Sequence, residues 1–325
     1  MTLTRRRMLQ LAAGSLALPL TPSLAAADTY PSRPARILVG FPAGGPVDIA
    51  ARLISPWLGE KLGQPFAVEN QPGESGNRAT RTALKSAADG YTLLLCGPVN
   101  TINTTLFAGL DFDFAQDSEP AGSLFRVPLI IEVNPSVPVN SAAEFLAYAK
   151  ANPGKLKVAY AGNGTPQHVG IELFKAMAGV DLTLVPYLGS APALADLLTG
   201  QVHAMFDPLP SSIGHIRNGR LRPLAVTTPL PSPILPDVPA MTDLLPGYEA
   251  GSWFGIVAPK GTPAHITERL NHEVNAGLNE DSIRARVIEL GGTVMTGSPA
   301  IFAGFITAET ERYARIIRAA GIKAG

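Results

Sequence analysis

The loop FPAGGP, residues 41–46, is the feature of the sequence that most restricts its fold. It follows an apolar run, residues 35–41, with the length and composition of a buried strand, and it precedes a stretch with helical spacing, residues 46–62. Glycine lets the backbone turn tightly, and proline is favoured at the first helical position because the N–H that it lacks has no partner inside a helix. The segment therefore predicts a strand, a tight loop and a helix that begins at Pro46.

A second segment repeats this pattern. Residues 157–161 read as a short strand, AGNGTP follows, and helical spacing runs from Pro166 to residue 178. Short β-rich runs alternate with helical patterns along most of the chain, which is typical of α/β folds with parallel sheets joined by crossover helices. Further strands are expected at residues 66–69, 91–96, 127–133, 182–185, 202–206, 224–226 and 253–258, and further helices at 80–87, 141–151, 192–198, 264–279 and 298–320.

Residues 228–239 interrupt this alternation, because they contain five prolines in twelve residues. Proline removes a backbone donor and fixes one backbone angle, so such a stretch can be neither a helix nor a central strand. We expect an extended connection here.

The N-terminus has the features of a secretory signal: a basic stretch, an apolar stretch and then small residues. The apolar stretch, residues 9–20, is too short to span a bilayer. We therefore expect residues 1–27 to be a signal peptide that is cleaved near Ala27 to release a periplasmic protein. The motif TRRRMLQ, residues 4–10, resembles a twin-arginine signal, and the general secretory route stays open as the alternative.

Removal of the signal takes away three arginines and no acidic residue, so the mature chain has 23 basic and 26 acidic residues and a net charge of −3. No basic run points to nucleic acid or to an anionic membrane as a partner. The single cysteine, Cys96, excludes a disulfide within the chain. We expect a soluble monomer.

The two glycine loops are candidate anion sites. The first N–H groups of a helix have no partner inside it, and the helix dipole adds partial positive charge, so the helix starts at Pro46 and Pro166 suit a carboxylate. Two such loops facing each other across a cleft would hold a small carboxylate at both ends. The alternative is that both are ordinary strand–helix turns, which frequently contain glycine and proline.

Motifs of enzymes are absent from the sequence. Neither loop has the spacing G-x-G-x-x-G, and no P-loop, H-E-x-x-H or G-x-S-x-G motif occurs. The five histidines do not have the spacing of metal ligands. We therefore expect no catalytic residues, no metal and no cofactor. His168 lies in the first turn of the second helix, where it contacts a ligand or caps the turn.

The segment YPSRPARILVGFPAGGPVD, residues 30–48, resembles the start of Bug-type solute-binding proteins, the receptors of tripartite tricarboxylate transporters. The resemblance continues through ENQPG at 69–73, GNGTPQH at 162–168, VPYLGSAPA at 185–193 and SWFG at 252–255. It implies a type II periplasmic-binding-protein fold, with two Rossmann-like α/β lobes that are joined by crossing hinge segments and close on a ligand. Lobe 1 would be residues 28–125 plus 229–325, and lobe 2 would be residues 126–228.

The resemblance also implies where a ligand binds. Leu188 stands where many members of the family have lysine or arginine, so one positive charge that could pair with a ligand carboxylate is missing. Asp207 would receive a ligand ammonium group or cap the chain after its strand. The candidate ligand-binding residues are Phe41, Pro42, Ala43, Gly44, Gly45 and Asp48 from the first loop, Asn100 and Thr101 from residues 97–103, and Asn163, Gly164, Thr165, His168, Tyr187, Gly189, Ser190 and Asp207 from the second lobe.

The function implied is that of a receptor that captures a small organic carboxylate and delivers it to the membrane permease subunits of a tripartite transporter. Two alternatives stay open at this point. One is an exported α/β enzyme that acts on a small carboxylate, and the other is a ligand sensor for a signalling partner.

Overall fold

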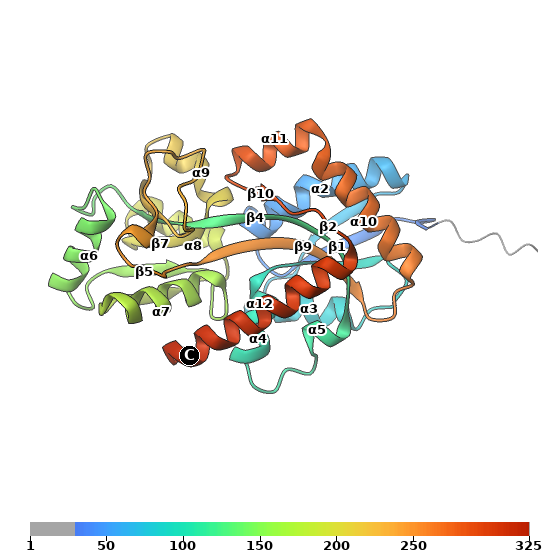
Figure 1. Ribbon diagram of the computed structural model, residues 1–325, viewed down its shortest axis with the longest axis horizontal. Coiled ribbons are helices and arrows are strands. Elements are labelled where there is room, and N and C mark those ends of the chain that lie inside the picture. The colour runs from blue at the N-terminus through green and yellow to red at the C-terminus, as the bar shows by residue number, and fades with distance from the viewer. Residues whose placement is uncertain (1–29, 325) are drawn as a thin grey trace, which may run out of the picture.

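Two antiparallel strands, β4 (Ser118–Val133) and β9 (Gly251–Pro259), run side by side through the middle of the molecule and connect two α/β lobes (Figure 1). The structure is a computed structural model that describes residues 30–324, and the expected signal peptide lies outside the described residues. The first part of β4 pairs with β9, and its last five residues pair with strands of the second lobe. One continuous strand therefore belongs to both sheets, as expected for a crossing segment.

The first lobe is built on the strand order β2–β1–β3–β9–β4. β1 pairs in parallel with β2 and β3, whereas β9 runs antiparallel to β3. Ile37, Leu93 and Ile256 lie in its buried core. The elements of this lobe are β1 (Ala35–Val39), α2 (Pro46–Leu62), β2 (Phe66–Asn70), η1 (Glu74–Gly76), α3 (Asn77–Leu84), β3 (Thr92–Cys96), α4 (Pro98–Leu106), α5 (Phe114–Asp117), α10 (Ala264–Asn279), α11 (Asp281–Glu289), β10 (Thr293–Val294) and α12 (Pro299–Ala320).

The second lobe continues the sheet in the order β4–β7–β5–β6, with β8 also paired to β4. β5 pairs in parallel with β6 and β7. Leu129, Phe174 and Phe206 lie in its core. The elements of this lobe are α6 (Ala142–Ala151), β5 (Lys157–Tyr160), α7 (Pro166–Ala178), β6 (Thr183–Pro186), α8 (Ser190–Thr199), β7 (Ala204–Pro208), α9 (Leu209–Arg217), β8 (Arg222–Val226) and η2 (Met241–Asp243).

The proline-rich segment and the residues that follow it pack against the second lobe. Val238 is buried in the same apolar cluster as residues of α8 and α9, and Tyr248 is buried beside Phe174. The Tyr248 hydroxyl also donates a hydrogen bond to the carbonyl of Gly170 in α7. Val238 and Tyr248, which belong to the expected first lobe, therefore pack against helices of the second.

Four α-helices were not expected from the sequence: α4, α5, α9 and α11. α4 covers residues 98–106, which were read as part of a loop, because threonine and asparagine have low helix propensity. β4 is also longer than the expected strand at 127–133. Residues 228–239 contain no helix and no strand, as predicted, but they form turns around one isolated bridge, Ser232–Leu235, and are not extended throughout.

α12 runs from the first lobe along the molecule toward α7 of the second (Figure 1). Its residues Tyr313 and Ile317 share a buried cluster with Ile102 of α4 and Val169 of α7. The C-terminal helix therefore contacts both lobes. No helix within residues 30–324 has the length and apolar character needed to cross a membrane.

Candidate functional site

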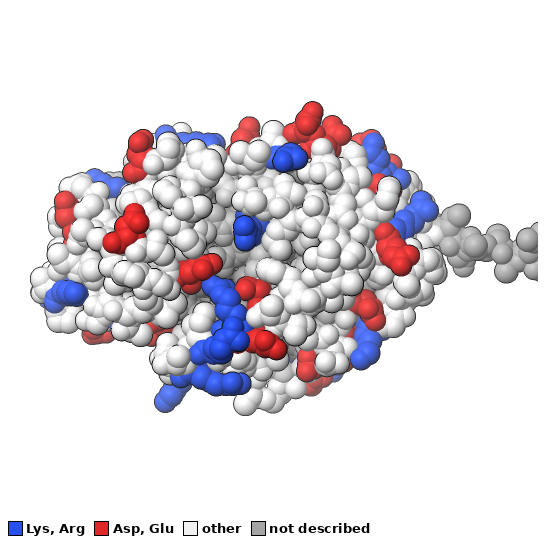
Figure 2. Space-filling model, in the orientation of Figure 1, with Lys and Arg blue, Asp and Glu red and all other residues white. Residues whose placement is uncertain are grey.

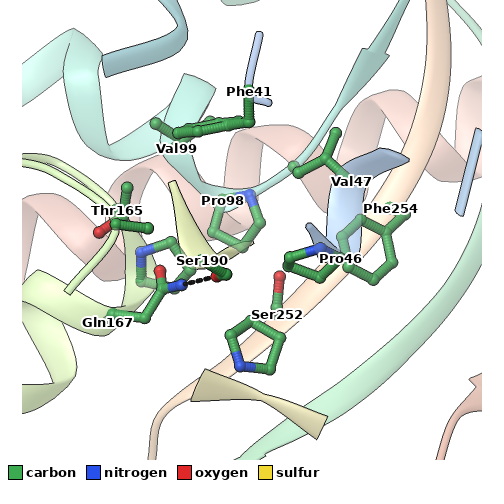
Figure 3. Close-up of a pocket in the computed structure, with 14 residues that line it drawn as sticks. Phe41, Pro46, Val47, Pro98, Val99, Thr165, Gln167, Ser190, Ser252 and Phe254 are labelled. Atoms are coloured by element: carbon green, nitrogen blue, oxygen red, sulfur yellow. Dashed lines mark hydrogen bonds between the residues drawn. The ribbon is translucent and has the colours of Figure 1, made fainter. Parts of the chain in front are cut away.

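A cavity lies between the two lobes. Both lobes supply its walls: Thr165 and Gln167 of the second lobe face Pro46, Val47 and Phe254 of the first (Figure 3). The lining residues are Phe41, Pro46, Val47, Gly97, Pro98, Val99, Ala161, Thr165, Pro166, Gln167, Ser190, Pro208, Ser252 and Phe254.

Four helices begin at this cavity. Pro46, Pro98 and Pro166 occupy the first turns of α2, α4 and α7, and Ser190 begins α8. The backbone N–H groups in such turns have no partner within the helix, and the helix dipoles place partial positive charge there. The cavity therefore offers hydrogen-bond donors from both lobes.

None of the fourteen lining residues is lysine or arginine. On the face of the molecule seen in Figure 2, basic side chains gather in one stripe below the centre, with acidic side chains beside it, and elsewhere the two signs are interspersed. Attraction of an anion into the cavity would therefore have to come from backbone groups rather than from charged side chains of the lining.

Asp48 holds the first glycine loop. Its side chain is 3% exposed and accepts hydrogen bonds from the backbone N–H of Gly44 and from the side chains of Arg52 and Asn70, at 2.9–3.0 Å. Burial alone would raise the pKa of Asp48, but the hydrogen bonds from Arg52, Gly44 and Asn70 lower it below its usual value. Asp48 is not among the residues that line the cavity. Its carboxylate holds the first glycine loop through the backbone N–H of Gly44 and does not face the cavity.

The other candidate ligand-binding residues of the first lobe differ in their positions: one lines the cavity, one caps α2 and two stabilise the first turn of α4. Phe41 lines the cavity, and Gly45 is the buried N-cap of α2. Asn100 and Thr101 lie inside α4 and are buried: Asn100 accepts from the backbone N–H of Gly97, and Thr101 donates to the carbonyl of Pro98. Both side chains therefore stabilise the first turn of α4.

Pro42, Ala43 and Gly44 lie nearer the rim, where the lobes meet. A Cβ at Gly189 of the second lobe would lie 2.7 Å from Pro42 Cδ, and a Cβ at Gly44 would lie 3.8 Å from the Cβ of Ala191. The approach at Pro42 therefore requires glycine at residue 189, whereas 3.8 Å at Gly44 is an ordinary van der Waals distance. The structure shows the lobes closed over the cavity.

In the second lobe, Thr165 caps α7 and lines the cavity. Its hydroxyl accepts from the backbone N–H of His168 at 3.3 Å and donates to the carbonyl of Gly162 at 2.7 Å. His168 is buried, stacks on Tyr160 and accepts from the backbone N–H of Gly164 through Nδ1. Burial lowers the pKa of His168, so its ring is neutral at pH 7.

Asn163 and Tyr187 hydrogen-bond within the protein. The side chain of Asn163 accepts from the Tyr160 hydroxyl at 2.7 Å and donates to the carbonyl of Ala324. The Tyr187 hydroxyl donates to Asp196 at 2.6 Å. Neither residue lines the cavity in the closed arrangement.

Asp207 lies behind Ser190 and Gln167 rather than in the cavity. Its side chain is fully buried, and it accepts from the Ser190 hydroxyl at 2.6 Å and from the Gln167 amide at 3.2 Å. Gln167 also donates to the oxygen of Ser190 at 3.1 Å (Figure 3). These three side chains form one network, and only Ser190 and Gln167 reach the cavity.

Several lining residues were not found from the sequence, among them Val47, Pro98, Gln167, Ser252 and Phe254. Two features of the sequence could have indicated some of these residues. The pair Gly97-Pro98 is a third copy of the glycine–proline helix start, and Ser252 and Phe254 alternate along β9, with the side chain between them packed in a different cluster.

The described residues contain no group of three or more His, Cys, Asp or Glu side chains that could hold a metal ion. Cys96 is buried on β3, where burial raises the pKa of its thiol, and its sulfur contacts the carbonyl of Gly255 at 3.3 Å. A buried thiol of raised pKa is a poor nucleophile.

Residues 50–322 match the sequence profile of the family described as "Tripartite tricarboxylate transporter family receptor". The chain belongs to this family. Protein BugT of Bordetella pertussis is 37% identical over 301 residues, which cover 91% of this chain and 92% of BugT. The resemblance to Bug-type proteins is confirmed. The protein is a solute-binding receptor and not an enzyme.

Solved structures share the fold. A protein from R. palustris with adipate has a TM-score of 0.88 and 40% identity, covering 90% of this chain and 99% of that one. Periplasmic binding protein BugD has a TM-score of 0.87 and 32% identity, with 90% and 99% covered. MatC from Rhodopseudomonas palustris, with bound malate, has a TM-score of 0.85 and 31% identity, with 89% and 100% covered. The expected periplasmic-binding-protein fold is confirmed.

Proposed function

We propose that the protein captures a small organic carboxylate between its lobes in the periplasm and delivers it to the permease subunits of a tripartite transporter. The observation that carries this proposal is the cavity at which four helices begin without any lysine or arginine. Helix N-termini bind anions through backbone N–H groups and the helix dipole. Solved members of the same fold hold adipate and malate, which are both carboxylates.

The apolar part of the lining suits the body of such a solute. Phe41, Val47, Val99 and Phe254 are buried or half-buried side chains on the first-lobe side of the cavity. Ligand sites are usually apolar with a few polar groups that set orientation. We therefore propose a solute with a hydrocarbon body and a carboxylate that is held by backbone N–H groups. Export by the N-terminal signal and a monomeric state belong to the same proposal.

The test is the melting temperature of the mature protein, residues 28–325, with a panel of carboxylates. The protein is first unfolded and refolded to remove any co-purified solute. A solute at about 100 times its dissociation constant adds about 2.7 kcal/mol of stability, which is a clear shift in melting temperature. A response to carboxylates alone supports the proposal. Shifts with sugars or cations and none with carboxylates would refute it.

A further inference from the structure

Two buried carboxyl groups lie behind the second-lobe wall of the cavity. Glu132 of β4 and Asp207 of β7 are both fully buried. The hydroxyl oxygen of Ser212 in α9 lies 2.6 Å from Glu132 Oε1 and 3.2 Å from Asp207 Oδ2. Within the described part of the chain, Glu132 Oε2 has no hydrogen-bond partner. Neither carboxyl group has a lysine or arginine bonded to it in this part of the chain, so two charges here would be very unfavourable.

The hydrogen bonds assign the negative charge to Asp207. Its oxygens accept from Ser190, Gln167, Ser211 and Ser212, whereas Glu132 meets only Ser212. Burial raises the pKa of both groups, but the pKa of Glu132 is also raised by the charge of Asp207, whose own hydrogen bonds act in the opposite direction. Glu132 is therefore the neutral member of the pair.

The charge of Asp207 decides how Gln167 is oriented. A carboxylate only accepts hydrogen bonds, so the amide nitrogen of Gln167, and not its carbonyl oxygen, must face it. Asp207 Oδ1 and Ser190 Oγ lie only 2.6 Å apart, so one hydrogen of that nitrogen is shared between them, at 3.2 and 3.1 Å. Gln167 lines the cavity, and its Oε1 has no hydrogen-bond partner among the described residues and is not one of their fully buried unpartnered atoms. This oxygen is therefore available to accept a hydrogen bond from a bound solute.

Ser190 is oriented in the same way. Its single hydroxyl hydrogen is donated to Asp207 Oδ1 at 2.6 Å, and its oxygen accepts from Gln167. Ser190 therefore has no hydrogen left for a solute and can only accept, and the carbonyl oxygen of Gln167 is a second acceptor beside it. A bare carboxylate placed against this wall would meet acceptors, with the charge of Asp207 behind them.

We propose that Asp207 is a positioning residue that sets the specificity of the cavity through Gln167 and Ser190, so that this wall receives a hydrogen-bond donor of the solute, a hydroxyl or an ammonium group. The carboxylate of the solute then lies at the helix N-termini. This inference rests on the proposed function and names the second polar group of the solute. A dicarboxylate would reach this wall only with a proton or a water molecule between the oxygens.

The inference is tested with solutes that differ only at one end. Hexanoate, ω-hydroxyhexanoate, ω-aminohexanoate and adipate share one hydrocarbon body, and the butanoate and pentanoate series adjust the length. Dissociation constants are measured by calorimetry on the refolded mature protein. In the best-fitting series we expect the hydroxyl or ammonium end to improve affinity about three- to tenfold over the unsubstituted acid, the gain typical of one hydrogen bond. The hydroxyl and ammonium series show which donor is preferred.

Two matched substitutions separate the roles of the buried acids. Asp207→Asn removes the charge and frees Gln167 to rotate, so the preference for a donor end should fall to about twofold or less. Glu132→Gln replaces one neutral group with another and should keep the preference of the wild-type protein. Gln167→Leu removes the Gln167 acceptor together with one hydrogen bond to Asp207, while the charge of Asp207 and its bond from Ser190 remain. It should reduce the preference to about twofold or less, which covers the case in which Asp207→Asn does not fold.

The outcomes are distinct. Binding of carboxylates with equal affinity for donor and unsubstituted ends, or an unchanged preference in Gln167→Leu, would overturn this inference and leave the proposed function standing. A Glu132→Gln variant that loses the preference while Asp207→Asn keeps it would also overturn it. Failure of every carboxylate to bind the wild-type protein would overturn both.

Discussion

Gly164 of the second lobe packs directly against the side chain of Asn103 in the first. A Cβ at Gly164 would overlap Asn103 Oδ1 and lie 3.0 Å from the ring of Phe107. The Asn103 amide nitrogen is held by the carbonyl of Ser75 and by Asn77, so the side chain cannot easily move away. The closed arrangement of the lobes therefore depends on the absence of a side chain at residue 164.

Replacement of this glycine should interfere with closure. Gly164→Ala introduces a methyl group at the contact between the lobes, so the closed state becomes less favourable and affinity for any bound carboxylate should fall about tenfold or more. The matched control is Gly179→Ala, because Gly179 has a similar φ of 63° but nothing within 4 Å of its Cβ position.

Both substitutions place alanine at positive φ and should cost about 1 kcal/mol of stability. Only Gly164→Ala should weaken binding. Small-angle scattering with and without ligand reports the closure itself, and equal affinities of the two variants would show that residue 164 has no part in closure.

The sequence predicted those parts of the site that depend on local backbone geometry. The helix starts at Pro46 and Pro166 were found because glycine and proline are required there, and Ser141 caps α6 as expected. α4 was missed because threonine and asparagine are weak helix formers, and its first turn is stabilised by the side chain of Asn100.

Contacts between distant residues could not be predicted from the sequence. Gln167 lies inside a helix and shows no local signal of its role, which is set by Asp207 forty residues later in the chain. The contact between Asn103 and Gly164 likewise exists only when the lobes are assembled. Such contacts depend on how the two lobes fold and pack, and they decide which candidate residues reach the cavity.

The charge of Asp48 should stabilise the first glycine loop. Asp48→Asn weakens the hydrogen bonds from Arg52 and Gly44, so we expect the free energy of unfolding at pH 7 to fall by about 1–2 kcal/mol. Because the pKa of Asp48 is lowered in the folded protein, this contribution is fully present above the unfolded-state value, about 3.9. It is lost as the pH falls through the folded-state pKa.

The measurement is urea unfolding of ligand-free protein between pH 7 and pH 3. The difference between wild type and Asp48→Asn should shrink below about pH 4. Asp89→Asn, which removes a surface pair with Arg33, is the control and should have a much smaller effect. A difference that is constant over the whole range would show that the charge of Asp48 does not hold the loop.

Leu188 should have little influence on carboxylate binding. Its side chain is 70% exposed and does not line the cavity. Leu188→Lys should therefore change the dissociation constant of a carboxylate less than about twofold, since an exposed charge is screened by water. Leu230→Lys, at a residue that is 76% exposed, is the matched control. A tenfold gain confined to Leu188→Lys would place the new charge at the ligand.

Thr165 should contribute to both stability and binding. Its hydroxyl caps α7 by accepting from the backbone N–H of His168, and it also lines the cavity. Thr165→Ala should reduce the free energy of unfolding by about 1 kcal/mol, as for other N-cap residues. It should also weaken carboxylate binding, because the first turn of α7 is then less well held where its N–H groups face the cavity.

Ser141 provides the control for this prediction. It caps α6 by accepting from the backbone N–H of Glu144 at 3.1 Å and does not line the cavity, so Ser141→Ala should lower stability by a similar amount without any change in affinity. Urea unfolding gives the stabilities and calorimetry with one bound carboxylate gives the affinities. If the two variants lose equal stability and both bind as tightly as the wild type, the N-terminus of α7 does not hold the anion.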